Sequence, residues 1–151
     1  MFQRVMIVGI VILLSIFFQT AFVLIETIDK PNKAVISFCK AYYQLDEAAK
    51  ELVTDSCRVQ DDVDLIDQYF LTQKKIANDR GYVDKFLVNY LTNVNAHVIE
   101  KTKNSAIVNF KAKRFAIIPW LRHRKTYDVD HTFTLTLKNH KWLITEGLAN
   151  M

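Results

Sequence analysis

The stretch that decides the fold is residues 124–146, RKTYDVDHTFTLTLKNHKWLITE. Apolar and polar side chains alternate along its first part. One face of the alternation carries Tyr127, Val129, His131, Phe133, Leu135 and Leu137. Because successive side chains of a strand point to opposite faces, this pattern predicts a long strand over residues 124–138 with one buried face.

Three further strands complete the predicted sheet. Residues 139–140 form a turn into residues 141–146, where apolar side chains again alternate with polar ones. Upstream, residues 93–101 predict a strand, residues 102–104 its turn, and residues 105–116 another strand. One face of that last strand carries Ala106, Val108, Phe110 and Ala112. Neighbouring strands joined by short turns predict an antiparallel sheet of about four strands.

Before residue 93 the apolar residues recur at helical spacing. The pattern predicts a long amphipathic helix from Pro31 to about residue 55, a second over residues 63–76 and a third over residues 82–91. Helices followed by a run of neighbouring strands are typical of an α+β fold. We therefore expect about three helices packed on a curved antiparallel sheet of about four strands.

The chain resembles the nuclear-transport-factor-2-like superfamily, which has a cone-shaped α+β fold. The resemblance rests on the opening helix AVISFCKAY (34–42), the central strand 127–137 and the closing strand KWLITE (141–146), and it covers roughly residues 33–148. It implies a concave sheet face that serves different members as a ligand pocket, an active site or an oligomer interface. The fold alone does not select among these uses.

The N-terminal segment is strongly apolar. Residues 5–25 contain no charged side chain, and 21 helical residues span about 30 Å, the thickness of a bilayer's hydrocarbon core. The segment therefore predicts a tail and a single transmembrane helix within residues 1–30, anchored in the lipid bilayer, followed by a domain over residues 31–151. The alternative is a signal peptide cleaved after Ala21. Arg4 and the short tail resemble a signal anchor, so we expect a bacterial inner (plasma) membrane protein with an extracytoplasmic domain.

A basic and apolar stretch, KAKRFAIIPWLRHRK, covers residues 111–125. It holds six of the 20 Lys and Arg residues and no acidic residue. Trp and Arg are common anchors of protein interfaces, and they also suit a membrane surface. The residues predicted to contact a partner or lipid are Arg114, Phe115, Ile118, Trp120, Leu121, Arg122 and Arg124. In a third interpretation, the apolar residues fold back to cap the sheet. Nucleic acid is not expected, because the basic cluster is short.

His131 and Tyr127 are the only candidates for catalysis. Both belong to the apolar face of the long strand, where an imidazole beside a phenol could act as a general acid or base. The alternative is a core histidine with a structural hydrogen bond. Alternation sends Asp128 and Asp130 to the opposite face, so we expect them to be solvated or paired with nearby arginines.

Metal and cofactor chemistry is not predicted. The four histidines lack the spacing that prearranges metal ligands. Cys39 and Cys57 are separated by a predicted helical stretch of roughly 24 Å, which is too long for a disulfide. We expect two free cysteines.

These features predict a non-enzymatic, membrane-anchored accessory or assembly subunit of a larger envelope complex, with protein subunits as partners. In layout it resembles the membrane-tethered cone-fold domains of the type IV secretion assembly-factor class. The alternative is a small-molecule-binding or enzymatic cone-fold domain that uses a pocket around His131 and Tyr127.

Overall fold

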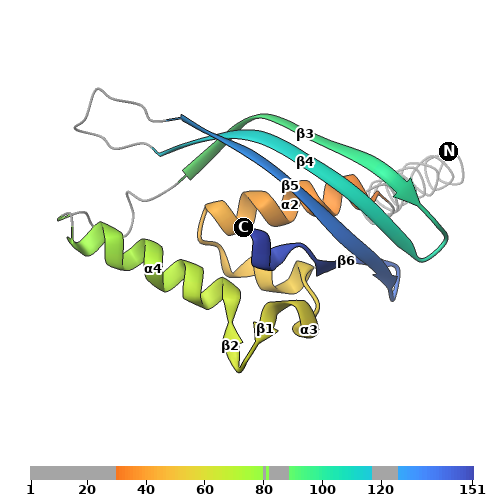
Figure 1. The fold of residues 1–151 in the computed structure, drawn as a ribbon, viewed down its shortest axis with the longest axis horizontal. Coiled ribbons are helices and arrows are strands. Elements are labelled where there is room, and N and C mark those ends of the chain that lie inside the picture. The colour runs from red at the N-terminus through yellow and green to blue at the C-terminus, as the bar shows by residue number, and fades with distance from the viewer. Residues whose placement is uncertain (1–29, 80, 82–88, 117–125) are drawn as a thin grey trace, which may run out of the picture. The chain divides into compact units, whose positions relative to one another are not determined.

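The computed structural model of the chain describes residues 30–79, 81, 89–116 and 126–151. The helical elements come first and the long strands follow (Figure 1). In chain order the elements are α2 (Pro31–Tyr43), the 3-10 helix η1 (Glu47–Leu52), α3 (Asp55–Arg58), β1 (Val59–Gln60), β2 (Val63–Asp64), α4 (Leu65–Asp79), β3 (Asn89–Lys101), β4 (Ser105–Ala116), β5 (Thr126–Lys138), β6 (Lys141–Glu146) and the 3-10 helix η3 (Leu148–Asn150).

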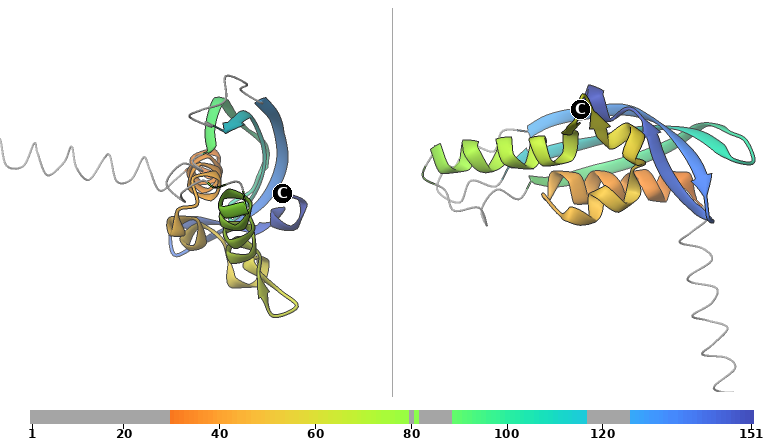
Figure 2. Two further views of the ribbon diagram at one scale, coloured as in Figure 1. Left: turned by 90° about the vertical axis from the view of Figure 1, so that its left-hand side faces the viewer. Right: turned by 90° about the horizontal axis from the view of Figure 1, so that it is seen from below.

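The main sheet has four antiparallel strands in the order β3-β4-β5-β6. The long strands form an arc, and α2 lies on its concave side, as the left view of Figure 2 shows. The α+β architecture and the four-stranded antiparallel sheet agree with the sequence prediction, and β4 and β6 have the predicted bounds. Register shifts at Thr92/Asn95 and Val98/Glu100 interrupt the pairing of β3 with β4. Such bulges increase the local bend of a strand.

Helix α2 lies against the concave face of this sheet. Phe38 of α2, Phe110 of β4 and Phe133 of β5 are all fully buried, and the rings of Phe38 and Phe133 meet edge to face at 5.9 Å. Burying an aromatic side chain contributes roughly 1.5–3 kcal/mol. This aromatic layer therefore holds the helix on the sheet. Cys39 and Cys57 are both free, as predicted.

The predicted first helix is interrupted. Helix α2 ends at Tyr43, and Leu45 adopts a left-handed conformation with φ 58°. The Asp46 side chain then accepts a hydrogen bond from the Ala48 amide at 3.0 Å and caps η1. A side-chain acceptor at this point competes with continued helix, which is why apolar spacing alone overestimated its length.

The predicted third helix, residues 82–91, is also corrected. Residues 82–88 lie outside the described part of the chain, but residues 89–91 belong to β3, where Tyr90 pairs with Phe115 and Leu91 with Arg114. Strand β3 therefore begins four residues before the predicted position 93. Pairing with β4 outweighs the local helical spacing, as tertiary contacts often do.

No helix of the described residues is long and apolar enough to cross a membrane. Helix α2 has 13 residues, which span roughly 20 Å, and it carries Lys33 and Lys40. This finding corrects two predictions: a fold that includes a transmembrane helix, and a localisation as a single-pass membrane protein. The predicted segment, residues 5–25, itself lies outside the described residues.

Candidate functional site

The predicted contact stretch is described only in part. Arg114 and Phe115 lie in β4, whereas Ile118, Trp120, Leu121, Arg122 and Arg124 lie outside the described residues. In the register of the sheet, Arg114 pairs with Tyr127 and Phe115 with Thr126. Neighbouring strand residues point to opposite faces. Arg114 thus lies with Phe110 on the concave face of the sheet, which we call the inner face. Phe115 lies on the opposite, outer face and stacks on Tyr90 with ring centroids 5.9 Å apart.

Arg114 lies among tyrosines from three other elements. Its guanidinium carbon is 5.3 Å from the ring centroid of Tyr43 in α2 and 5.1 Å from that of Tyr127 in β5. Both distances fall within the range of cation–π attraction. Tyr42 of α2 stacks on Tyr69 of α4, with centroids 4.2 Å apart and an interplanar angle of 12°. We call Tyr42, Tyr43, Tyr69, Arg114 and Tyr127 the tyrosine–arginine cluster.

The local structure explains how these residues meet. Tyr42 and Tyr43 occupy the last turn of α2, so both rings reach the end of the sheet where β4 and β5 pair. Tyr69 lies near the start of α4. The first turn of this helix is capped by Asp64, whose carboxylate accepts hydrogen bonds from the amides of Ile66 and Asp67 at 2.9 and 3.1 Å. Asp64 therefore fixes where the helix that carries Tyr69 begins.

Arg114 has no acidic partner within 4.0 Å among the described residues. The Tyr69 hydroxyl interacts with the Arg114 side chain, although neither this hydroxyl nor the buried Arg114 Nε makes a hydrogen bond of full geometry within the described part of the chain. A buried polar group left without a partner costs roughly 1–3 kcal/mol. The cluster therefore holds donor capacity that the described protein groups satisfy only in part.

The acidic residues of β5 are engaged on the other face of the sheet. The Asp130 carboxylate lies 2.9 Å from the Lys111 ammonium and accepts a hydrogen bond from Asn109 at 2.8 Å. Asp128 faces Lys113 at 4.0 Å. The prediction that both aspartates lie opposite His131 holds, with lysines rather than arginines as partners. Neither carboxylate reaches Arg114.

The tyrosines do not neutralise Arg114. Burial raises the pKa of Tyr42 and of Tyr43 above the usual range. Burial also raises the pKa of Tyr69, an increase that the positive charge of Arg114 and a side-chain hydrogen-bond interaction with it oppose. All three phenols are therefore protonated at neutral pH, and each can donate a hydrogen bond.

His131 lies next to the cluster on the inner face of β5. Burial lowers the pKa of His131. The negative charge of Asp130 opposes this decrease, and the positive charge of Arg114 adds to it. The ring is therefore neutral at pH 7 and packs near Phe133, with centroids 6.3 Å apart. Tyr127 is 46% exposed. No hydrogen bond joins His131 to Tyr127, so the two predicted catalytic residues share a face without forming an acid–base pair.

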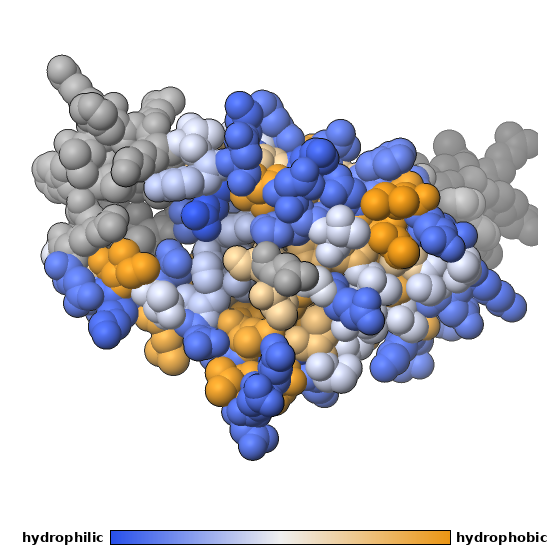
Figure 3. Space-filling view, in the orientation of Figure 1, coloured by the Kyte–Doolittle hydropathy of each residue, from blue (hydrophilic) through white to orange (hydrophobic). Residues whose placement is uncertain are grey.

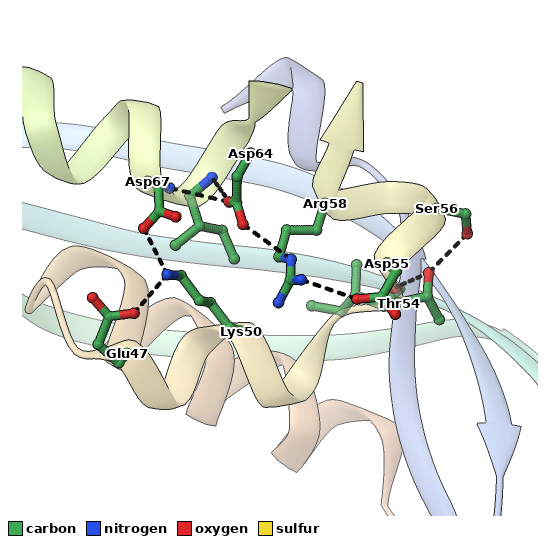
Figure 4. A network of polar contacts seen from close by, with 10 residues as sticks. Glu47, Lys50, Thr54, Asp55, Ser56, Arg58, Asp64 and Asp67 are labelled. Atoms are coloured by element: carbon green, nitrogen blue, oxygen red, sulfur yellow. Dashed lines mark hydrogen bonds and ion pairs between the residues drawn. The ribbon is translucent and has the colours of Figure 1, made fainter. Parts of the chain in front are cut away.

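A second polar group of residues links the helical elements through ion pairs (Figure 4). The Lys50 ammonium lies 2.7 Å from Glu47 and 2.6 Å from Asp67, which joins η1 to α4. Arg58 lies 3.1 Å from both Asp55 and Asp64, which joins α3 to the start of α4. Since each charge meets an opposite charge, this network has a structural role.

No other candidate binding site stands out on the surface of the described residues. Hydrophilic residues dominate the face in Figure 3, and the hydrophobic ones form separate patches. The exposed large hydrophobic residues of the described chain are Val59, Val63, Leu71, Ile76, Tyr90, Ile99 and Tyr127. Such scattered residues are normal on a protein surface. Among the described residues, no group of three or more His, Cys, Asp or Glu side chains could hold a metal ion.

The sequence pattern placed Arg114 in a contact surface and Tyr42 in the core, and it did not connect them. One signal was available: two adjacent tyrosines end the first helix, and buried tyrosines usually need a partner for the hydroxyl group. No protein-family model matches the chain, and no curated protein matches it.

Proposed function

We propose that the domain is a non-enzymatic binding module of the cone-fold, nuclear-transport-factor-2-like type, which takes up a small molecule with an anionic group at the tyrosine–arginine cluster. The observation that carries this proposal is the Arg114 guanidinium, which lies between Tyr43 and Tyr127 without an acidic partner among the described residues. A partly buried charge is costly unless it is paired. An anionic ligand supplies the missing charge.

The surrounding groups favour binding over catalysis. The raised pKa values of Tyr42, Tyr43 and Tyr69 make these phenols poor bases at neutral pH. His131 is neutral and could accept a proton, but within the described residues no hydrogen bond orients its ring. A general base works best when a second group holds it in position. The described residues therefore supply recognition more completely than proton transfer.

That the domain binds a protein partner stays a prediction. The transmembrane anchor is no longer part of this prediction. Five of its seven contact residues lie outside the described part of the chain. The two that are described, Arg114 and Phe115, lie on opposite faces of β4 and so cannot belong to one flat contact surface.

The test is an anion titration of the isotopically labelled full chain, followed by NMR. Sodium benzoate, sodium acetate and inorganic phosphate serve as probes. At least one of them should shift the backbone signals of Tyr43, Tyr69 and Tyr127 in a saturable manner. Arg114→Gln should abolish this response, and Arg114→Lys should weaken it, because an ammonium lacks the planar fork of donors.

Lys113→Gln is the matched control. It removes one positive charge from the next residue of the same strand, but Lys113 lies on the outer face opposite Asp128. The titration of this variant should match the wild type. The proposal fails if no anion shifts the three tyrosines, or if the response survives in Arg114→Gln.

A further inference from the structure

We infer that the ligand of the tyrosine–arginine cluster is an aromatic monocarboxylic acid, bound with its carboxylate on Arg114 and its ring beside Tyr127. This inference rests on the proposed function and narrows it to one chemical class. It follows from the charge of the site, from the shape of the donor groups and from the position of the exposed aromatic surface.

The charge favours a single negative charge on the ligand. Lys111 and Lys113, the other cations in this part of β4, pair with Asp130 and Asp128 on the outer face. His131 is neutral at pH 7, because burial lowers its pKa. The described inner face of β4 and β5 near the cluster thus presents one positive charge, from Arg114. A carboxylate balances it, whereas phosphate carries more than one negative charge at this pH.

The donor groups favour a planar acceptor. A guanidinium presents its N–H groups in one plane, in a fork that matches the two oxygens of a carboxylate. The rings of Tyr43 and Tyr127 contact the guanidinium at 5.3 and 5.1 Å. The Tyr69 hydroxyl oxygen interacts with Arg114, which has only donors, so its O–H can still donate a hydrogen bond to a carboxylate oxygen.

The exposed ring of Tyr127 favours a ligand that carries an aromatic ring. Its side chain is 46% exposed although its ring contacts the charged group, so the aromatic surface next to Arg114 is open to solvent. A ligand ring that covers this surface makes an aromatic pair and leaves the carboxylate close to the guanidinium. An acid without a ring gains only the ionic contact.

The test compares dissociation constants of benzoate, acetate and inorganic phosphate for the full chain, measured by the NMR titration. Benzoate should bind about two- to twelvefold more tightly than acetate, in line with the strength of one aromatic pair. It should also bind more tightly than phosphate. Tyr127→Ser should bring the ratio of the benzoate and acetate dissociation constants close to one.

Tyr90→Ser is the matched control for the ring. Tyr90 is 43% exposed, close to the value for Tyr127, but it stacks on Phe115 on the outer face. This variant should keep the preference for benzoate. Phosphate binding more tightly than benzoate, or acetate binding as tightly as benzoate, overturns the ligand class and leaves the proposed function standing. If none of the three anions binds at the cluster, the proposed function itself is wrong.

Discussion

At the scale of single residues, Gly147 shows how closely the end of the chain approaches the sheet. Its φ of 106° is a conformation that other residues rarely adopt, and a Cβ added there would lie 2.5 Å from the Thr132 carbonyl oxygen and 3.0 Å from the Phe133 ring. Gly81 also has a positive φ, 73°, but a Cβ there meets nothing within 4 Å. A comparison of the same substitution at the two glycines therefore separates the energetic cost of backbone strain from that of steric overlap.

We predict that Gly147→Ala is much more destabilising than Gly81→Ala. The left-handed backbone costs an alanine roughly 1–2 kcal/mol at either position. Overlap with β5 adds about 1–3 kcal/mol at Gly147 alone. Urea denaturation of both variants measures the difference in the free energy of unfolding. Equal losses would show that the close approach of Gly147 to β5 is not present in solution.

At the scale of elements, Asp64 connects three of them. Its carboxylate caps α4 through the amides of Ile66 and Asp67, and it also lies 3.1 Å from the Arg58 guanidinium of α3. The hairpin of β1 and β2 delivers Asp64 to this position through a turn at Asp61 and Asp62, both with positive φ. Two consecutive residues with positive φ are typical of a type I′ hairpin turn.

We predict that Asp64→Ala lowers the free energy of unfolding by about 1–2 kcal/mol, since a helix cap and an ion pair are both lost. Asp64→Asn should recover most of this loss, because asparagine also caps helices well. Chemical denaturation of the two variants at pH 7 distinguishes the contributions. If the asparagine variant is as unstable as the alanine variant, the ion pair with Arg58 is the main contribution and the cap is minor.

At the scale of the whole molecule, the placement of His131 links folding to pH. Burial and Arg114 hold its pKa in the folded state below the ordinary value near 6.5, and Asp130 only partly opposes them. Between the folded pKa and about 6.5 the unfolded chain binds more protons at this site than the folded chain does. The stability from a neutral His131 is therefore complete above pH 6.5 and is lost as the pH falls through this window.

We predict that His131→Asn makes the free energy of unfolding less dependent on pH between 7 and 5. The variant removes the proton that the unfolded wild-type chain takes up at this site. His97→Asn, at an exposed position of β3, serves as the control and should keep the wild-type slope. Denaturation curves at several pH values give the slopes, and an unchanged slope in His131→Asn would contradict the placement of His131.

The sequence by itself determined the sheet. Alternation with a period of two residues requires only that one face of each strand is buried, so it located β4, β5 and β6 from local pattern. The helical spacing was less decisive. Its period says nothing about where a capping aspartate stops a helix, as Asp46 does after α2, or where a strand takes over, as at Asn89.

Only the tertiary structure decided the candidate site. Arg114 and Tyr127 meet through strand register, Tyr43 reaches them because α2 packs against the sheet, and Tyr69 of α4 lies against Tyr43. No local pattern encodes the contact of Tyr43 with Tyr69, 26 positions away, or with Arg114, 71 positions away. The physical reason is that such a cluster depends on packing of distant elements, whereas the alternation along a strand depends on which face of that strand meets water.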